Sequence, residues 1–272
     1  MSEIVLSGGV RSNLLNLQAT EDLIAKTQIR LSTGKRINSA LDNPTNFFTA
    51  QTLNNRAGDL SGLLDSMGSA IKTLQAADNG ITSITKLVQS AQALARQAQQ
   101  TTDATERASL ATQFDATRAQ IDTLAADAGF NGKNLINGDD LKVVFNEAGT
   151  SSLTITGVTD TTAGALAIPG AVGSWAADAN IQTSLDAATA ALSTLRTQSK
   201  AFGSSLSTVQ ARQDFTKSMV NTLTTGADNL TLADSNEEGA NLLALQTRQQ
   251  LSTTALSLAV QSDRNVLRLF GG

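Results

Sequence analysis

The sequence contains no cysteine, no histidine and no tyrosine, and it has only one tryptophan and two prolines. Without cysteine it has no disulfide and no thiol nucleophile, and without histidine it lacks the commonest general base and metal ligand. We therefore expect neither an enzyme active site nor a metal or other cofactor. The scarcity of proline, in contrast, permits long helices.

Aromatic residues make up 3% of the 272 residues, whereas apolar residues make up 40%. Thick globular cores draw much of their buried area from aromatic rings. Here leucine, alanine, isoleucine and valine must supply the packing, and they suit narrow seams between helices. The net charge of −4, with no basic stripe, argues against nucleic acid as a partner.

Long apolar runs are missing as well. No window approaches the ~18 consecutive apolar residues of a membrane helix, so we expect no membrane partner. The first 17 residues, MSEIVLSGGVRSNLLNL, have no basic segment followed by a long apolar run. A cleaved secretory signal is therefore not predicted, which leaves a cytosolic protein or one exported without such a signal.

Three stretches carry apolar residues at alternating spacings of four and three, the spacing of a coiled-coil seam. The second runs from Leu53 to Val88, with the polar Asp78 and Thr85 at two of its positions, and the third runs from Ile181 to Leu230. The first comprises Val10, Leu14, Leu17, Ile24 and Leu31, with the polar Glu21 and Gln28 interrupting it at two positions. The pattern predicts a mainly α fold, a long antiparallel helical bundle or coiled coil.

Two breaks and a small middle region interrupt these helices. Residues 33–43 end one helix, and Asn43 and Pro44 are typical of the start of the next. A third helix is expected from Asp103, as N-cap, to Gly129. Asn-Gly turns at 131–132 and 137–138 precede a β-hairpin at about 141–158, and 159–179 is predicted to be a short surface loop.

The second break, at 233–241, is acidic and is followed by a last helix that runs to Phe270. Its stripe holds Leu256, Val260, Leu267 and Phe270. The predicted order is nearly palindromic: short helix, break, long helix, small middle, long helix, break, short helix. Such a chain goes out and returns, so its terminal helices should pair.

This order, together with three local segments, resembles bacterial flagellin. The segments are RLSTGKRINSALDNP (30–44), FNGKNLING (130–138) and the tail from residue 240 to 270. The resemblance covers about 4–138 and 178–272. It implies a structural subunit that polymerises into the extracellular flagellar filament for swimming motility.

The resemblance also implies a division into layers. Residues 1–32 and 240–272 would form an inner coiled coil, 33–43 and 233–239 the spokes, and 44–179 with 180–232 an outer helical bundle. The expected polymerisation interface is Val10, Leu14, Leu17, Ile24, Leu31, Leu242, Leu245, Leu256, Val260, Leu267 and Phe270. The polar contacts expected at the spokes are Lys35, Arg36, Asn38, Asp42, Glu237 and Glu238.

The partners implied by the resemblance are other copies of the chain, an export chaperone, a filament cap and hook-junction proteins. Export would use the flagellar type III channel. Many flagellins carry a Gln-Arg-Val-Arg-Glu-Leu stretch that a toll-like receptor reads. The matching positions here lack its arginines and glutamate, so weak or no recognition is expected: Gln89, Ser90, Ala91, Gln92, Ala93 and Leu94.

Two other readings stay open. A hook–filament junction protein shares both flagellin ends but would not polymerise alone. A non-flagellar coiled-coil structural protein, such as an adaptor or an adhesin stalk, would explain the heptads but not the paired breaks or the hairpin. Glu237-Glu238 and Asp139-Asp140 are adjacent acids at breaks, which are usually solvated rather than catalytic or metal-binding.

Overall fold

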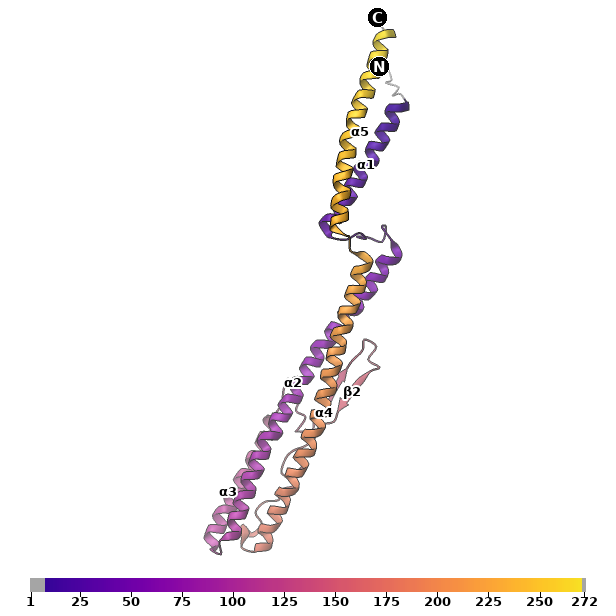
Figure 1. Ribbon diagram of the computed structural model, residues 1–272. Coiled ribbons are helices and arrows are strands. Elements are labelled where there is room, and N and C mark those ends of the chain that lie inside the picture. Colours follow the sequence, from indigo (N-terminus) through magenta and orange to yellow (C-terminus); the bar gives the residue numbers. More distant parts are fainter. Residues whose placement is uncertain (1–7, 271–272) are drawn as a thin grey trace. The chain divides into compact units, whose positions relative to one another are not determined.

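A computed structural model of the protein describes residues 8–270, with the side chains of 263 and 266–270 left out. Helices dominate and one small antiparallel sheet accompanies them, which confirms the mainly α prediction (Figure 1). The elements are α1 (Gly8–Thr33), α2 (Pro44–Gln100), α3 (Ala104–Asp127), β1 (Leu141–Val144), β2 (Ser152–Ile155), η1 (Val172–Trp175), α4 (Asp178–Thr231) and α5 (Ser235–Phe270).

The chain divides into two compact units. Met1–Asn55 with Thr222–Gly272 makes the first, here called the terminal unit, and Arg56–Asn221 makes the second, here called the central unit. Within 8–270, no helix is both long enough and apolar enough to cross a bilayer.

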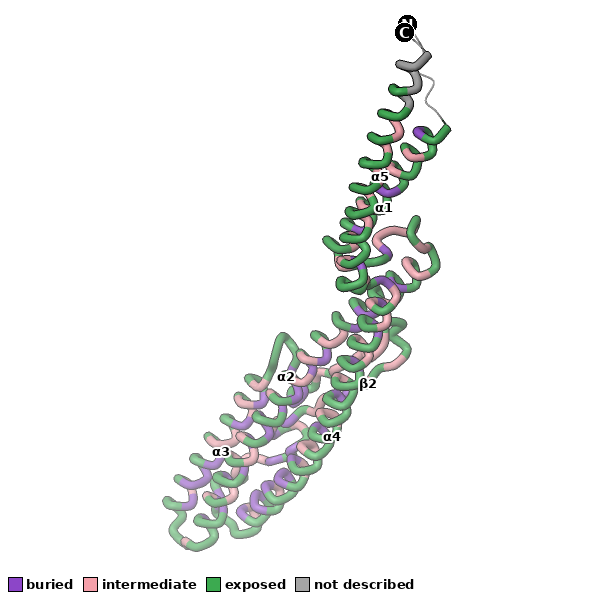
Figure 2. The backbone as a smooth tube through the Cα atoms, turned by 45° about the horizontal axis from the view of Figure 1, so that its top comes forward, coloured by how far each residue is buried: buried purple, intermediate pink, exposed green. Residues whose placement is uncertain are grey.

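The central unit is built around one apolar core between α2, α3 and α4 (Figure 2). On α2 the buried side chains alternate at spacings of three and four, as in a coiled coil. They are Met67, Ala70, Leu74, Ala77, Ile81, Ile84, Val88, Ala91, Ala95 and Ala98. The sequence pattern had placed Asp78 and Thr85 in this seam. Asp78 is exposed but accepts a hydrogen bond from Ser199 Oγ of α4 at 3.0 Å, and Thr85 is half-buried. Both therefore lie at the edge of the seam, and their neighbours Ala77 and Ile84 are buried within it.

Helix α4 follows the predicted stripe more closely. Most of its predicted seam positions within the central unit are buried, and their spacing keeps one face against the core throughout. The buried members are Ile181, Leu185, Ala188, Leu192, Leu195, Phe202, Val209 and Thr216.

Helix α3 begins as the sequence predicts. The Asp103 carboxylate accepts hydrogen bonds from the backbone N–H groups of Thr105 (2.7 Å) and Glu106 (3.2 Å), and these bonds lower the pKa of Asp103. The N-cap therefore satisfies two of the four free donors at the helix start. The helix ends at Asp127, close to the predicted Gly129.

Two turns and a hairpin follow α3. Asn131 and Gly132 both have positive φ, as a type I′ turn requires, and Gly138 has φ 94°. The strands pair antiparallel, with Leu141 opposite Ile155 and Val144 opposite Ser152. The hairpin is confirmed, although its regular strands are shorter than the predicted 141–158.

The segment after the hairpin is not the surface loop that the sequence predicts. Leu166, Ile168 and Trp175 are buried, and the Trp175 indole lies 5.0 Å from the Phe114 ring of α3. The Trp175 Nε1–H donates to Ser184 Oγ of α4 at 3.1 Å. Small glycines and alanines make the segment resemble a loop, but its few large side chains complete the core.

Candidate assembly interface

The terminal unit is built on the pairing of α1 with α5, which lie side by side and antiparallel (Figure 1). On α1 the side facing α5 carries Val10, Asn13, Leu17, Thr20, Ile24 and Thr27, all buried or half-buried. Their spacing alternates between three and four. The seam is coiled-coil-like, as predicted, but half of its positions are polar.

The phase of this seam corrects the sequence pattern. Val10, Leu17 and Ile24 lie in the seam as predicted, whereas Leu14 and Leu31 are exposed. The predicted members Glu21 and Gln28 are exposed too. Sequence reasoning preferred Leu14 to its neighbour Asn13, and with that choice it also missed Thr20 and Thr27. The signal that was missed is that α1 fits the 4-3 spacing in two registers, one through Leu14 and one through Asn13.

Helix α5 presents the expected residues to α1. Leu242, Leu245, Leu256 and Val260 are half-buried. Gln249, Ser252 and Ala259 complete the seam between them at the same spacing. Leu267 and Phe270 belong to α5, but their side chains lie outside the described residues.

Both helices leave large apolar side chains on the side away from the seam. Leu251 is 67% exposed and Leu258, one heptad further, is 69% exposed. On α1, Leu15 and Ile29 are exposed two heptads apart, so they share a face. Among the described residues, nothing covers these apolar stripes of α1 and α5, and Figure 2 shows how few buried residues the pair holds.

The two breaks of the chain lie against each other. Arg36 N–H donates to Thr231 O at 2.7 Å, and Ala233 N–H donates to Gly34 O at 3.0 Å. The first break, 34–43, agrees with the predicted 33–43. The second is shorter than the predicted 233–239, because α5 begins at Ser235 with Asp234 accepting from the N–H groups of Asn236 and Glu237.

The first break is an ordered turn rather than a slack linker. Asp42 accepts from the N–H groups of Asn38 (3.1 Å) and Ser39 (3.2 Å), and its other oxygen lies 3.5 Å from Lys26 Nζ. The Asn38 bond is the largest cause that lowers the pKa of Asp42. Asn43 caps α2 by accepting from Asn46 N–H, as predicted.

Of the other predicted polar contacts in this break, Asn38 is occupied within the chain, because its amide donates to Lys35 O at 2.8 Å. Lys35 and Arg36 are both exposed. Leu41, at the tip of the same turn, is 96% exposed. The turn thus offers two cations and one apolar side chain outward.

Glu237 and Glu238 have different environments although they are neighbours. Glu237 is exposed, whereas Glu238 is buried and accepts from Arg30 Nη1 at 3.0 Å. The Glu238 carboxylate is therefore bonded to α1 of its own chain, and its predicted contact with another subunit stays a prediction. Arg30 stands in the last turn of α1 and Glu238 in the first turn of α5, so each charge also suits its helix dipole.

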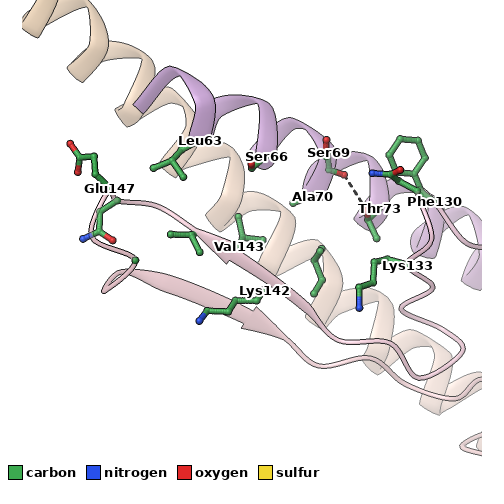
Figure 3. A pocket seen from close by; sticks show the side chains of 15 residues that line it. Leu63, Ser66, Ser69, Ala70, Thr73, Phe130, Lys133, Lys142, Val143 and Glu147 are labelled. Carbon is green, nitrogen blue, oxygen red and sulfur yellow. Dashed lines mark hydrogen bonds between the residues drawn. The ribbon is translucent and has the colours of Figure 1, made fainter. Parts of the chain in front are cut away.

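The central unit carries a groove of about 530 Å³ between α2 and β1 (Figure 3). Leu63, Ala70 and Val143 supply apolar walls, and Phe130 and Lys133 close one end. Among the described residues, no group of three or more acidic, cysteine or histidine side chains is placed to hold a metal ion.

The positions that match the receptor-read stretch lie on α2 within the central unit. Gln89, Ser90 and Ala93 are exposed, while Leu94 is half-buried against the core. Gln92 is half-buried and donates to Thr189 Oγ1 at 2.9 Å. The outward face at these positions therefore has no charge.

Comparison with known proteins gives matches to one family along nearly the whole chain. The family model for the bacterial flagellin N-terminal helical region matches residues 10–140, and that for the C-terminal helical region matches residues 185–270. Flagellin FljM and flagellin FljK of Caulobacter vibrioides are each 32% identical, over 99% of this chain and 99% of the relative. A flagellin of Brucella melitensis is 28% identical over both full lengths. The crystal structure of Bacillus cereus flagellin is 21% identical, covers 56% of this chain and 88% of that one, and has a TM-score of 0.49.

Proposed function

The chain belongs to the bacterial flagellin family, so it is a structural subunit of the flagellar filament, and we propose that the uncovered faces of α1 and α5 are its polymerisation surfaces. Flagellins form the extracellular filament by self-assembly. The observation that carries the proposal is the pair of apolar stripes, with Leu251 and Leu258 on α5 and Leu15 and Ile29 on α1. An interface that repeats without closing gives an open helical polymer.

The seam between α1 and α5 supports the same proposal, because its apolar packing is weak. It contains Thr20, Thr27, Gln249 and Ser252, which bury little apolar area. Holding both helices in place costs backbone entropy that such a seam offsets poorly. Neighbouring copies would supply the missing apolar contacts, so the pair would be most stable inside the polymer.

We propose the same layers as the resemblance implies, with the spokes redefined by their hydrogen bonds. The α1–α5 pair would form the inner coiled coil, and the bundle of the central unit would form the outer layer. The bonded segments 34–43 and 232–234 would be the spokes between them. Lys35, Arg36 and Leu41 are free to contact neighbouring copies there, whereas Asp42 and Glu238 hold their own chain together.

Electron microscopy with sonicated filament seeds tests the polymerisation surface. We expect long filaments from the full chain, and none from a chain with both Leu251→Gln and Leu258→Gln. The matched control is Gln246→Ser, an exposed polar position on the same helix, which should polymerise normally. Filaments from the double variant at the normal rate would mean that the interface lies elsewhere.

A chain without residues 1–32 provides the second arm of the same experiment. Removing α1 removes one stripe and the partner of α5, so this chain should not extend seeds. Failure of the full chain to polymerise even on seeds would instead favour a hook–filament junction protein.

The further partners follow from the family and are part of the proposal. They are an export chaperone, the filament cap and the hook-junction proteins, with export through the flagellar type III channel. Export is tested in a strain that lacks the channel's ATPase. The full chain should then remain inside the cell, and its appearance in the medium would contradict the proposed route.

Weak or no recognition by the toll-like receptor is also proposed. Arginine is a favoured interface anchor because its guanidinium makes paired hydrogen bonds. Here Ser90 and Ala93 replace the first arginine and the glutamate of the recognised stretch, on an exposed face. A receptor reporter assay should give a response far below that of a flagellin with the full stretch, and an equal response would refute this.

A further inference from the structure

Three Asn-Gly pairs occur in the chain, and the structure places them in three different backbone settings. Asn-Gly is chemically the most labile asparagine sequence, because glycine has no side chain to shield its backbone nitrogen. That nitrogen can attack the asparagine side-chain amide. The reaction needs a free glycine N–H and room for the backbone to rotate. The pairs are Asn79–Gly80, Asn131–Gly132 and Asn137–Gly138.

The Asn131–Gly132 pair meets both needs. It forms the tip of the turn between Phe130 and Lys133, and both of its residues are exposed. Its φ angles are 49° and 73°. Phe130 and Lys133 exchange backbone hydrogen bonds of 2.8 and 3.0 Å, but the Gly132 N–H has no acceptor among residues 8–270. Opening this turn locally would break few contacts.

The other two pairs have their glycine nitrogens engaged. Gly138 N–H donates to Val158 O at 2.9 Å, and Asn137 forms a bridge with Thr159. Gly80 lies inside α2, where its N–H belongs to the helix ladder. Gly80 is also buried, so close to its neighbours that an added Cβ would lie 2.6 Å from Ile136 Cδ1.

We propose that Asn131 is a site of spontaneous deamidation in the folded protein, and that Asn79 and Asn137 are protected. The Gly132 nitrogen attacks Asn131 Cγ, a C–N bond forms, and ammonia leaves with the proton that the glycine nitrogen gives up. The product is a five-membered succinimide. Water then opens either of its two carbonyls and gives aspartate or isoaspartate at position 131. Solvent water is the only co-reactant.

The product changes a structured part of the central unit. Isoaspartate inserts one extra main-chain atom between Phe130 and Lys133 and so disturbs their paired hydrogen bonds. The next residue, Asn134, donates to Ala125 O (2.8 Å) and Ala126 O (3.0 Å) and so holds the end of α3. Either product places a new carboxylate beside Lys133 at the end of the groove in Figure 3. Subunits in an extracellular filament lie beyond intracellular repair, so such products would accumulate with age.

Peptide mapping by mass spectrometry tests the proposal on the full-length monomer, incubated at mildly alkaline pH and sampled over weeks. One lost hydrogen bond is worth enough to change a rate by about tenfold. We therefore expect Asn131 to deamidate at least about tenfold faster than Asn79 and Asn137. An isoaspartate-specific methyltransferase should label the same peptide.

Two controls separate the fold from the local sequence. In strong denaturant the three rates should converge, because all three pairs share the same dipeptide. Asn131→Ser should abolish the methyltransferase signal of the folded chain without shifting it to another peptide. Equal rates in the folded chain, or faster reaction at Asn79 or Asn137, would overturn the proposal.

Discussion

Asp160 lies fully buried in the segment that follows β2. Neither carboxylate oxygen has a hydrogen-bond partner within the described chain, and Gln198 Oε1 is buried without a partner as well. Burial raises the pKa of Asp160 from 3.8 to about 6, and this exceeds the lowering effect of the Gln198 side chain. The native protein therefore holds a proton that the unfolded chain has already released between these two pH values.

The sign of the linkage gives a prediction. Stability from this group is fully present below about pH 4 and is lost as pH rises through about 6. Asp160→Asn removes the cost of the buried charge, so it should stabilise the protein relative to wild type by about 1–3 kcal/mol above pH 6. Urea unfolding of both proteins at several pH values measures this difference. The exposed control Asp59→Asn should give no such trend. A difference that does not change with pH would contradict the assignment.

Gly80 provides a second prediction at the scale of one residue. An added Cβ would lie 2.6 Å from Ile136 Cδ1 and 2.8 Å from Ala128 Cβ. Gly80→Ala should therefore cost about 1–3 kcal/mol through overpacking, although alanine favours helix by about 1 kcal/mol. Gly62→Ala in the same helix meets nothing within 4 Å and should stabilise by about that 1 kcal/mol. Thermal unfolding of the two variants measures these effects. A change in stability of the same sign for both variants would contradict the packing around Gly80.

At the scale of the element, an ion pair between Arg30 and Glu238 joins the end of α1 to the start of α5. Glu238→Gln keeps the shape of the side chain but removes the charge opposite Arg30, in a site where Glu238 is 6% exposed. We expect a loss of about 1–3 kcal/mol in the stability of the terminal unit. Glu237→Gln, one residue away and exposed, should cost almost nothing. The temperature at which filaments depolymerise reports both, and equal effects would argue against the ion pair.

Helices α4 and α1 also show how well the spacing of apolar residues predicts the buried face of a helix. On α4 the apolar stripe is unambiguous, and the predicted face is the buried one. On α1, Leu14 and Asn13 offer alternative phases of the same 4-3 repeat, and apolarity favours the wrong one. The partner helix decides the phase, because Asn13 and Thr20 face α5 while Leu14 points out. The few apolar residues of α1 are divided between the seam with α5 and the exposed face. The sequence therefore does not show which face packs against α5.

At the scale of the whole molecule, the two units should differ in stability. The central unit holds a continuous core, whereas the buried residues of α1 are only Val10, Thr20 and Thr27. In the free monomer, amides of α1 and of the described part of α5 should exchange with solvent faster than core amides by on the order of 100-fold or more. Hydrogen exchange followed by mass spectrometry measures this. Polymerisation should then protect both helices, and strong protection in the monomer would contradict a weak seam.

The sequence by itself determined the class and order of the elements. Alternating apolar spacing, Asn43-Pro44, the Asp103 cap and the Asn-Gly turns are local signals, and each depends on residues within a turn or two of one another. They sufficed for the helices, the hairpin and the paired breaks. They also predicted that the terminal helices pair, because a chain that goes out and returns brings its ends together.

Only the tertiary structure decided which face of each helix is covered and which polar groups form hydrogen bonds or ion pairs within the chain. Trp175 is buried because Phe114 of α3 packs against its ring and Ser184 of α4 accepts its indole N–H. Nothing in the residues around Trp175 indicates the contact with Phe114. Glu238 is taken by Arg30 across a separation of 208 residues, and Glu237 is not. The spacing of apolar residues is a local property of a helix. Which face is buried, which ion pairs form and which residues stay exposed depend on the partner that packs against the helix.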